Sequence, residues 1–192
     1  SAIIAFKVSR KDYSGFHIAA SHSDSPTLKI KESSEMNIEN QYVKLNVEKY
    51  GGMLCAPWFD RPLSVAGRII VKDGNRLTTK LINVDRDLLM IPNLAIHMNR
   101  EVNDGYKYNI QKDMLPLYRM SNSGKAFKEM IAEEAGVSVD QIKGMDLFLY
   151  NRMEGTVWGC DGEFISAPRL DDLQCAFTST MALLNSESDR CI

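Results

Sequence analysis

The middle of the chain alternates between apolar and polar residues. In the stretch VKLNVE at 43–48 every second side chain is apolar, which is typical of a strand with one buried face. The run LSVAGRIIV at 63–71 leads to Asp73-Gly74, a dipeptide that favours a tight hairpin, and residues 77–84 then supply the returning strand. The pattern predicts antiparallel β structure from about residue 42 to residue 118.

Helical spacing appears on the C-terminal side of this region. Phe127, Met130 and Ile131 lie at positions i, i+3 and i+4, and Gly136 is placed to cap the end of the helix. The strongest helical pattern lies at 173–184, directly after two aspartates, which are favoured at the N-terminal end of a helix dipole.

Short apolar runs bounded by loops predict strands on both sides of the middle region. They lie at 15–20 and at 146–150, and a further β stretch lies at 155–166. We therefore expect an α/β fold, with an α/β domain in two parts, 1–41 and 137–192, interrupted by a β-rich insertion at 42–136.

The composition is that of an ordinary folded chain. Of the 192 residues 44% are hydrophobic, which is too many for a disordered chain, and the net charge of -2 argues against nucleic-acid binding through bulk charge. No apolar run approaches the roughly 18–20 residues of a membrane-spanning helix, so we expect no membrane partner. The four cysteines are scattered without a C-x-x-C pair, which favours reduced thiols and a cytoplasmic location.

Two loops place residues that commonly bind metal ions beside the end of an element. The first is HSDSP at 22–26, after the predicted strand at 15–20. His22 can present a neutral imidazole nitrogen to a metal ion, and Asp24 can orient a ligand or polarise a bound water. The simpler interpretation is a loop histidine beside an aspartate that makes a local turn. This interpretation is favoured when the H-x-D pattern is taken alone, because the pattern is short and common.

The second loop is APRLDD at 167–172. Asp171 precedes an amphipathic helix, where a carboxylate can bridge two cations. Aspartate is also a good N-cap, so helix capping is the simpler interpretation. Neither loop is decisive alone.

Two further segments of the insertion combine chemically distinctive residues. His97 lies in IPNLAIHMNR at 91–100, where its apolar neighbours favour a packed or capped histidine. The segment WFDRP at 58–62 combines aromatic and ionic residues and favours a packing or interface role.

Taken together, four segments resemble the aspartyl aminopeptidase family of cocatalytic zinc metallopeptidases. The resemblance extends over about residues 16 to 185, and the four segments follow the order of the family: HSDSP at 22–26, WFDR at 58–61, IPNLAIH at 91–97 and SAPRLD at 166–171.

The resemblance implies a role for each matching residue. His22 would be the first zinc ligand, Asp24 the catalytic-site carboxylate that orients it, and Asp171 the bridge between two zinc ions about 3.5 Å apart. The insertion would be a barrel-like dimerisation domain, and His97 would bind substrate in the neighbouring subunit. The resemblance thus implies a homo-oligomer that removes N-terminal residues, often acidic, from peptides through metal-activated water. The ligand types also suit Co²⁺ or Mn²⁺.

The family's remaining ligands are implied to lie beyond Asp171: a glutamate pair with the general base, another carboxylate and a final histidine. These 192 residues do not supply them, so we expect this chain to be a segment of such an enzyme and inactive alone. Two alternatives remain: a non-catalytic self-association module built on the insertion, and a glutamyl or deblocking aminopeptidase with the same metal chemistry. The HSDSP and WFDR segments favour the aspartyl family.

Overall fold

A computed structural model describes residues 2–8, 12–13 and 15–186 of the chain. Its contacts define two compact units. One is Pro26–Met153, and the other combines Ser1–Ser25 with Glu154–Ile192.

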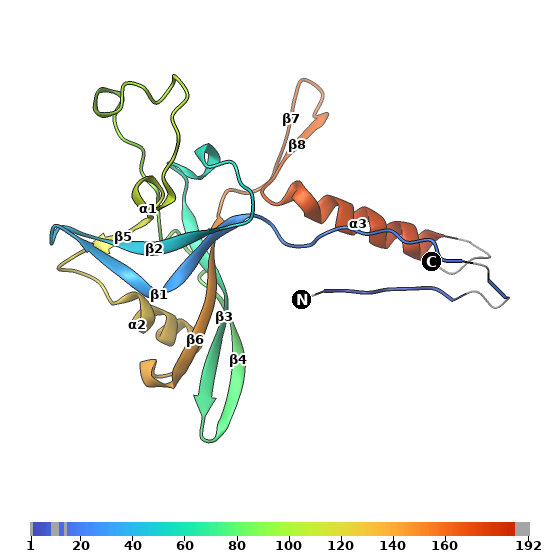
Figure 1. The fold of residues 1–192 in the computed structure, drawn as a ribbon, viewed down its shortest axis with the longest axis horizontal. Coiled ribbons are helices and arrows are strands. Elements are labelled where there is room, and N and C mark those ends of the chain that lie inside the picture. The colour runs from blue at the N-terminus through green and yellow to red at the C-terminus, as the bar shows by residue number, and fades with distance from the viewer. Residues whose placement is uncertain (1, 9–11, 14, 187–192) are drawn as a thin grey trace. The chain divides into compact units, whose positions relative to one another are not determined.

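The unit Pro26–Met153 is built on a six-stranded antiparallel sheet with the order β4-β3-β6-β1-β2-β5 (Figure 1). The strands are β1 (Thr27–Ile38), β2 (Tyr42–Tyr50), β3 (Leu63–Asp73), β4 (Arg76–Asn83), β5 (Leu117–Met120) and β6 (Ile142–Asn151). Bridges from Leu89 to Leu63 and from Met90 to Leu117 link β3 to β5, so that the sheet curls round toward a closed form.

The alternating pattern predicts β2, β3 and β4 correctly. Asp73 pairs with Arg76 across a two-residue turn, in which Gly74 has the positive φ of 58° that such turns require. The sheet extends beyond the predicted limits 42–136, however, because β1 pairs with β2 on one side and β6 pairs with β3 on the other. Local patterning shows that a strand exists but not which distant strand it pairs with, so it could not set these limits.

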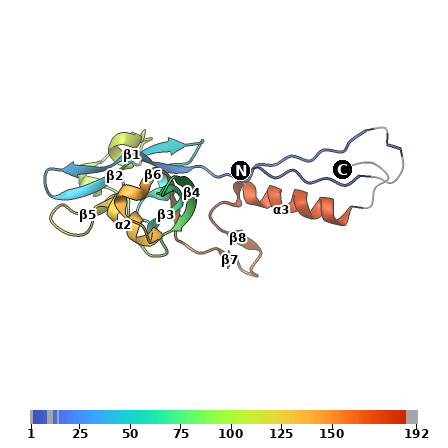
Figure 2. The ribbon, with the colours of Figure 1, turned by 90° about the horizontal axis from the view of Figure 1, so that it is seen from below.

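Helix α2 (Phe127–Ala135) lies against the sheet (Figure 2) and ends at Gly136, whose φ is 62°. This confirms the helix and its cap. A capping box at 138–141 begins the single 3-10 turn η3 (Val139–Gln141). The helix and the inner sheet face share one apolar core, which includes Leu28, Leu45, Leu63, Ile69, Phe127, Ile131 and Leu147.

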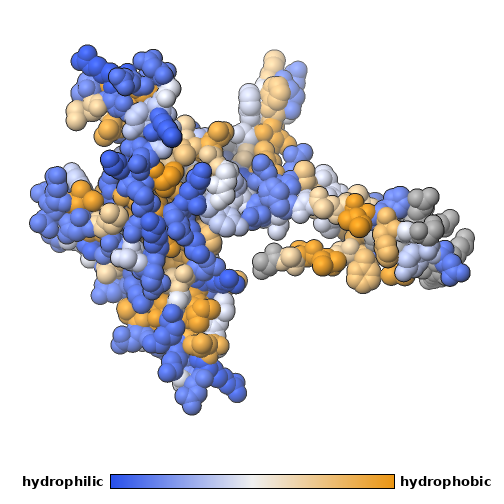
Figure 3. Space-filling model, viewed as in Figure 1, coloured by the Kyte–Doolittle hydropathy of each residue, from blue (hydrophilic) through white to orange (hydrophobic). Residues whose placement is uncertain are grey.

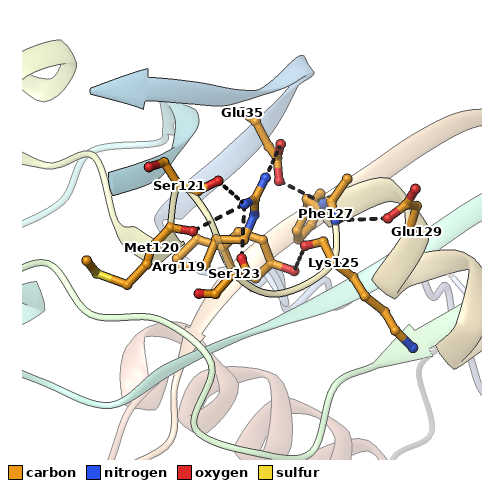
Figure 4. Close-up of polar contacts among 10 residues, drawn as sticks. Glu35, Arg119, Met120, Ser121, Ser123, Lys125, Phe127 and Glu129 are labelled. Atoms are coloured by element: carbon orange, nitrogen blue, oxygen red, sulfur yellow. Dashed lines mark hydrogen bonds and ion pairs between the residues drawn. The ribbon is translucent and has the colours of Figure 1, made fainter. Parts of the chain in front are cut away.

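Arg119 and Glu35 organise the turn that leads into α2 (Figure 4). Arg119 Nη1 donates to three carbonyl oxygens within residues 120–123, at 3.1 to 3.2 Å. Its Nη2 donates to Glu35 Oε2 at 3.3 Å, while Glu35 Oε1 accepts the Phe127 N–H at 2.8 Å. Glu35 therefore satisfies a backbone donor that the first turn of a helix leaves without an intrahelical partner.

Besides η3, three short helices lie in the loops of this unit: η1 (Ala56–Trp58), η2 (Ile96–Met98) and α1 (Ile110–Asp113).

The second unit contains a hairpin of β7 (Thr156–Trp158) and β8 (Phe164–Ser166), followed by helix α3 (Leu170–Asn185). Both elements were predicted. The N-terminal segment runs alongside α3 (Figures 1 and 2), and Lys7 Nζ donates to the carbonyls of Leu184 and Ser186 at 2.9 and 3.1 Å.

The strand predicted at 15–20 is wrong. Within it only Phe16 forms a β-bridge, and the apolar Phe16 and Ile18 are 68% and 87% exposed. A strand is stable only when its backbone groups pair with a neighbour, and no named strand of the described residues includes this segment. Exposed apolar side chains also cover the hairpin and α3, where Figure 3 shows orange surface, among them Val157, Ile165 and Phe177.

Two further predictions concerned the state of the cysteines and the membrane-spanning helices. Cys55, Cys160 and Cys175 are free thiols, while Cys191 lies outside the described residues. Within the part of the chain that the structure describes, none of the helices has the length and apolar character needed to cross a membrane.

Candidate metal centre

The two loops that carry predicted metal ligands lie side by side in the second unit. The His22 N–H donates to Asp172 Oδ2 at 3.2 Å, across 150 positions of sequence. The Ser25 hydroxyl donates to the backbone carbonyl of Asp171 at 3.1 Å. These two hydrogen bonds hold the HSDSP loop against the start of α3.

The two ring nitrogens of His22 have different surroundings. Nδ1 lies 3.0 Å from the backbone carbonyl oxygen of Asp24 and 3.3 Å from Asp24 Oδ1. On the other side of the ring, Nε2 lies 3.3 Å from Asp171 Oδ1. A carbonyl oxygen can only accept a hydrogen bond, so Nδ1 carries the proton that it donates to Asp24.

This tautomer leaves the neutral ring with a lone pair on Nε2 that faces a carboxylate. Two lone-pair groups at 3.3 Å repel each other unless a cation lies between them, either a proton on Nε2 or a metal ion. Two ligand atoms on one tetrahedral zinc are about 3.4 Å apart. His22 and Asp171 therefore fit neighbouring positions around such an ion.

The two aspartates at the start of α3 have different environments. The Asp171 side chain is 88% exposed, whereas that of Asp172 is 15% exposed. Asp171 and Asp172 have non-helical backbone angles, so the regular part of α3 begins after Asp172. Asp172 accepts hydrogen bonds from the backbone and thiol of Cys175, three residues further on, which is the arrangement of an N-cap for that part. The capping role that the sequence allowed for either residue falls to Asp172, and the Asp171 carboxylate is left for other partners.

The pKa directions agree with this geometry. The pKa of His22 is raised above its ordinary value, first by the hydrogen bond to the Asp24 carbonyl and then by the charges of Asp172, Asp171 and Asp24. The pKa of Asp172 is lowered, chiefly by the Cys175 thiol that donates to it, and the same contact raises the pKa of Cys175. These neighbours all favour a positive charge on or beside His22.

The sequence named His22, Asp24 and Asp171 as candidates, and the structure brings these three together; the sequence did not single out Asp172, Ser25 and Cys175, which contact the same two loops. The adjacent aspartates suggested that one of them caps the helix, yet nothing in the sequence distinguished the two. Across residues 2–8, 12–13 and 15–186, no group of three or more His, Cys, Asp and Glu side chains is arranged to hold a metal ion.

His97 lies in the unit Pro26–Met153, on the 3-10 turn η2. Its side chain is exposed, and its neighbours Leu94, Ile96 and Met98 are 65%, 54% and 70% exposed. The packed histidine that its apolar neighbours favoured is wrong, because those neighbours are not part of the core.

A histidine and an aspartate converge on one gap, with the histidine oriented by a second aspartate, and these are residue types that zinc commonly binds in proteins. Comparison with known proteins specifies the class further. The chain belongs to the M18 family, described as aminopeptidase I zinc metalloproteases, whose family model matches residues 1–192.

Individual relatives agree with this membership. The chain is 47% identical over 196 residues to a probable M18 family aminopeptidase 2 of Clostridium acetobutylicum, an alignment that covers 97% of this chain and 45% of that protein. Among solved structures, Ape4 in its complex with Nbr1 matches with 31% identity and a TM-score of 0.83, over 96% of this chain and 39% of that one. The S. cerevisiae mApe1 dodecamer matches with 26% identity and a TM-score of 0.68, over 89% and 40%. The chain thus spans less than half the length of these relatives.

Proposed function

We propose that this chain forms part of a zinc-dependent aminopeptidase and supplies His22 and Asp171 to its metal centre. One observation carries the proposal: Nε2 of His22, whose other nitrogen is committed to Asp24, lies 3.3 Å from the exposed carboxylate of Asp171. Membership of the M18 family supports zinc as the metal.

Each residue of the centre has a distinct task under this proposal. Asp24 holds His22 in the tautomer whose Nε2 lone pair faces the metal position, and Asp171 offers its carboxylate to the same position. Asp172 and Ser25 keep the two loops in register. Zinc held there would supply Lewis-acid chemistry to a peptide carbonyl and a water molecule.

The proposed substrates are peptides with an acidic N-terminal residue, and the proposed assembly is a cytoplasmic homo-oligomer with two zinc ions per site. The β-rich unit would mediate association and present His97 to the substrate site of a second copy. The exposed position of His97 among exposed apolar residues supports this role, because such a patch needs a partner surface. The mApe1 dodecamer supports assembly in general.

The alternative of a non-catalytic association module is not favoured. The family match extends over both metal-site loops as well as the β-rich unit, which a module built on the insertion alone does not require. His22 and Asp171 are nevertheless only part of a ligand set, so we expect the 192 residues alone to bind zinc weakly and to show no turnover.

The test uses the whole protein that contains this chain. Zinc content after dialysis and hydrolysis of Asp-, Glu- and Leu-p-nitroanilide are measured for the wild type and variants. We expect His22→Ala and Asp171→Asn to lose bound zinc and activity, and Asp24→Asn to weaken zinc binding about 10- to 100-fold. His17→Ala, a histidine change five positions from His22, is the control and retains both properties.

Two results would contradict the proposal. If His22→Ala keeps a full complement of zinc and wild-type turnover, the metal centre lies elsewhere. If the leucine substrate is hydrolysed faster than both acidic ones, the proposed substrate class is wrong although the aminopeptidase activity stands.

A further inference from the structure

Residues 94–107 form a loop that projects from the β-rich unit before α1 (Figure 1, yellow-green). His97 lies in this loop on η2, and the hydrogen bonds of that turn are local: the Met98 N–H donates to Ala95 and the Asn99 N–H donates to Ile96. The orientation of His97 relative to the sheet therefore depends on how the ends of the loop are fastened.

Asp60 fastens the first end. Its Oδ1 accepts the backbone N–H of Asn93 and its Oδ2 accepts the Asn93 side-chain amide, both at 2.9 Å. The Asp60 N–H donates to the Ile91 carbonyl, also at 2.9 Å. Because both carboxylate oxygens are engaged by one residue, the contact fixes the direction of the chain at Asn93 as well as its position.

Phe59, the preceding residue, fastens the second end. Its buried ring lies 5.0 Å from that of Tyr108, centroid to centroid, and Phe59 forms a parallel bridge with Ile91. Two adjacent residues thus hold both ends of the loop. Both belong to the WFDR segment, which contributes no residue to the proposed metal centre.

The backbone of Asp60 is suited to this task. Its φ is 56°, in the left-handed region that only Gly, Asn and Asp adopt readily. Hydrogen bonds from Asn93 hold the pKa of Asp60 below its ordinary value, so the carboxylate stays ionised and accepts both donors at neutral pH.

We propose that Asp60 is a positioning residue for His97: through Asn93 it holds the projecting loop in the orientation that presents His97 to the substrate site of a second copy of the chain. This rests on the proposed function, in which His97 contacts substrate. The proposal gives the WFDR segment a role that is separate from metal binding, namely to hold the loop that carries His97.

The experiment uses the whole zinc-loaded protein and two replacements that tolerate the left-handed backbone. Asp60→Gly removes both acceptors, while Asp60→Asn keeps one acceptor for the Asn93 N–H. We expect Asp60→Gly to lower kcat/KM by about 10- to 100-fold, mainly through KM, and Asp60→Asn to recover part of that loss. Asn40→Gly, at another left-handed residue with a φ of 54°, is the control and leaves kcat/KM unchanged.

A double-variant cycle separates positioning from general damage. If Asp60 acts through His97, Asp60→Gly combined with His97→Ala loses no more activity than His97→Ala alone, whereas independent effects multiply. Amide hydrogen exchange at residues 94–99 supplies a readout that does not depend on activity, and we expect it to accelerate in Asp60→Gly.

Multiplying losses, or unchanged exchange at 94–99, would overturn the positioning role. A His97→Ala protein with wild-type KM would overturn it too, since no function would then depend on the orientation of the loop. Failure of the proposed function is distinguished from these results because it appears in the wild type, as an absence of aminopeptidase activity.

Discussion

The pairing of β3 with β6 can be tested at Gly67. This residue pairs with Leu147 of β6 on one side and Ile82 of β4 on the other, and its φ is 152°. A Cβ atom added there would lie 2.2 Å from the backbone oxygen of Asp146 and 3.0 Å from the Leu147 Cα. Both are backbone atoms of a strand inside the sheet, so no side-chain rotation relieves the clash.

The expected cost of Gly67→Ala follows from two effects. Overpacking against an immobile neighbour costs about 1–3 kcal/mol, and a Cβ at an unfavourable positive φ costs about 1–2 kcal/mol more. We therefore expect the free energy of unfolding to fall by about 2–5 kcal/mol, a large fraction of a typical domain's 5–15 kcal/mol.

Gly144→Ala is the matched control, because Gly144 lies on the facing strand and an added Cβ would make only an ordinary 3.9 Å contact with Ile70. We expect the control to change stability by less than about 1 kcal/mol. Urea denaturation followed by tryptophan fluorescence measures both variants. Equal midpoints for the two would refute the close approach of β3 and β6 at this position.

Two other predictions concern named side-chain contacts of the same unit. Glu35→Ala removes the acceptor of the Phe127 N–H and the partner of Arg119, and we expect the free energy of unfolding in urea to fall by about 1–3 kcal/mol. The control Glu32→Ala, at an exposed position, should lower it by less than about 0.5 kcal/mol, and similar losses in the two variants would contradict the role of Glu35. The pKa of Asp60 is lowered by hydrogen bonds from Asn93, and the charge of Arg61 adds to the effect. The contact of the Asp60 carboxylate with Asn93 is therefore intact above the ordinary aspartate pKa and is lost as the pH falls through the lowered pKa. Amide exchange at 94–99, corrected for intrinsic rates, should therefore rise only below about pH 4 and not between pH 7 and pH 5.

The sequence predicted those parts of the fold that local chemistry determines. The Asp73-Gly74 hairpin and the Gly136 helix cap both depend on backbone conformations that neighbouring residues specify. The limits of the sheet depend instead on the pairing of β6 with β1 and β3, which are distant in sequence. The apolar run at 15–20 shows the opposite failure, because it has a strand-like pattern but no named strand of the described residues includes it.

For the candidate site, residue type and order predicted that His22 and Asp171 lie together, as they do, but not how the loop between residues 91 and 100 is held. The contact of Asp60 with Asn93 joins two segments that the sequence had marked separately, and no pattern in either one indicated the other. Such a link is determined by the tertiary fold alone.

The adjacent aspartates at the start of α3 give a prediction that separates a helix cap from a metal ligand. Asparagine caps a helix as well as aspartate does but is a far poorer zinc ligand, because it carries no charge. Asp172→Asn in the whole protein should therefore keep its zinc and its thermal midpoint, whereas Asp171→Asn should lose zinc. Asp172→Ala, which removes the acceptor for Cys175, should lower the midpoint. If Asp172→Asn releases zinc as readily as Asp171→Asn, both carboxylates bind the metal, and the division between an exposed ligand and a capping neighbour is wrong.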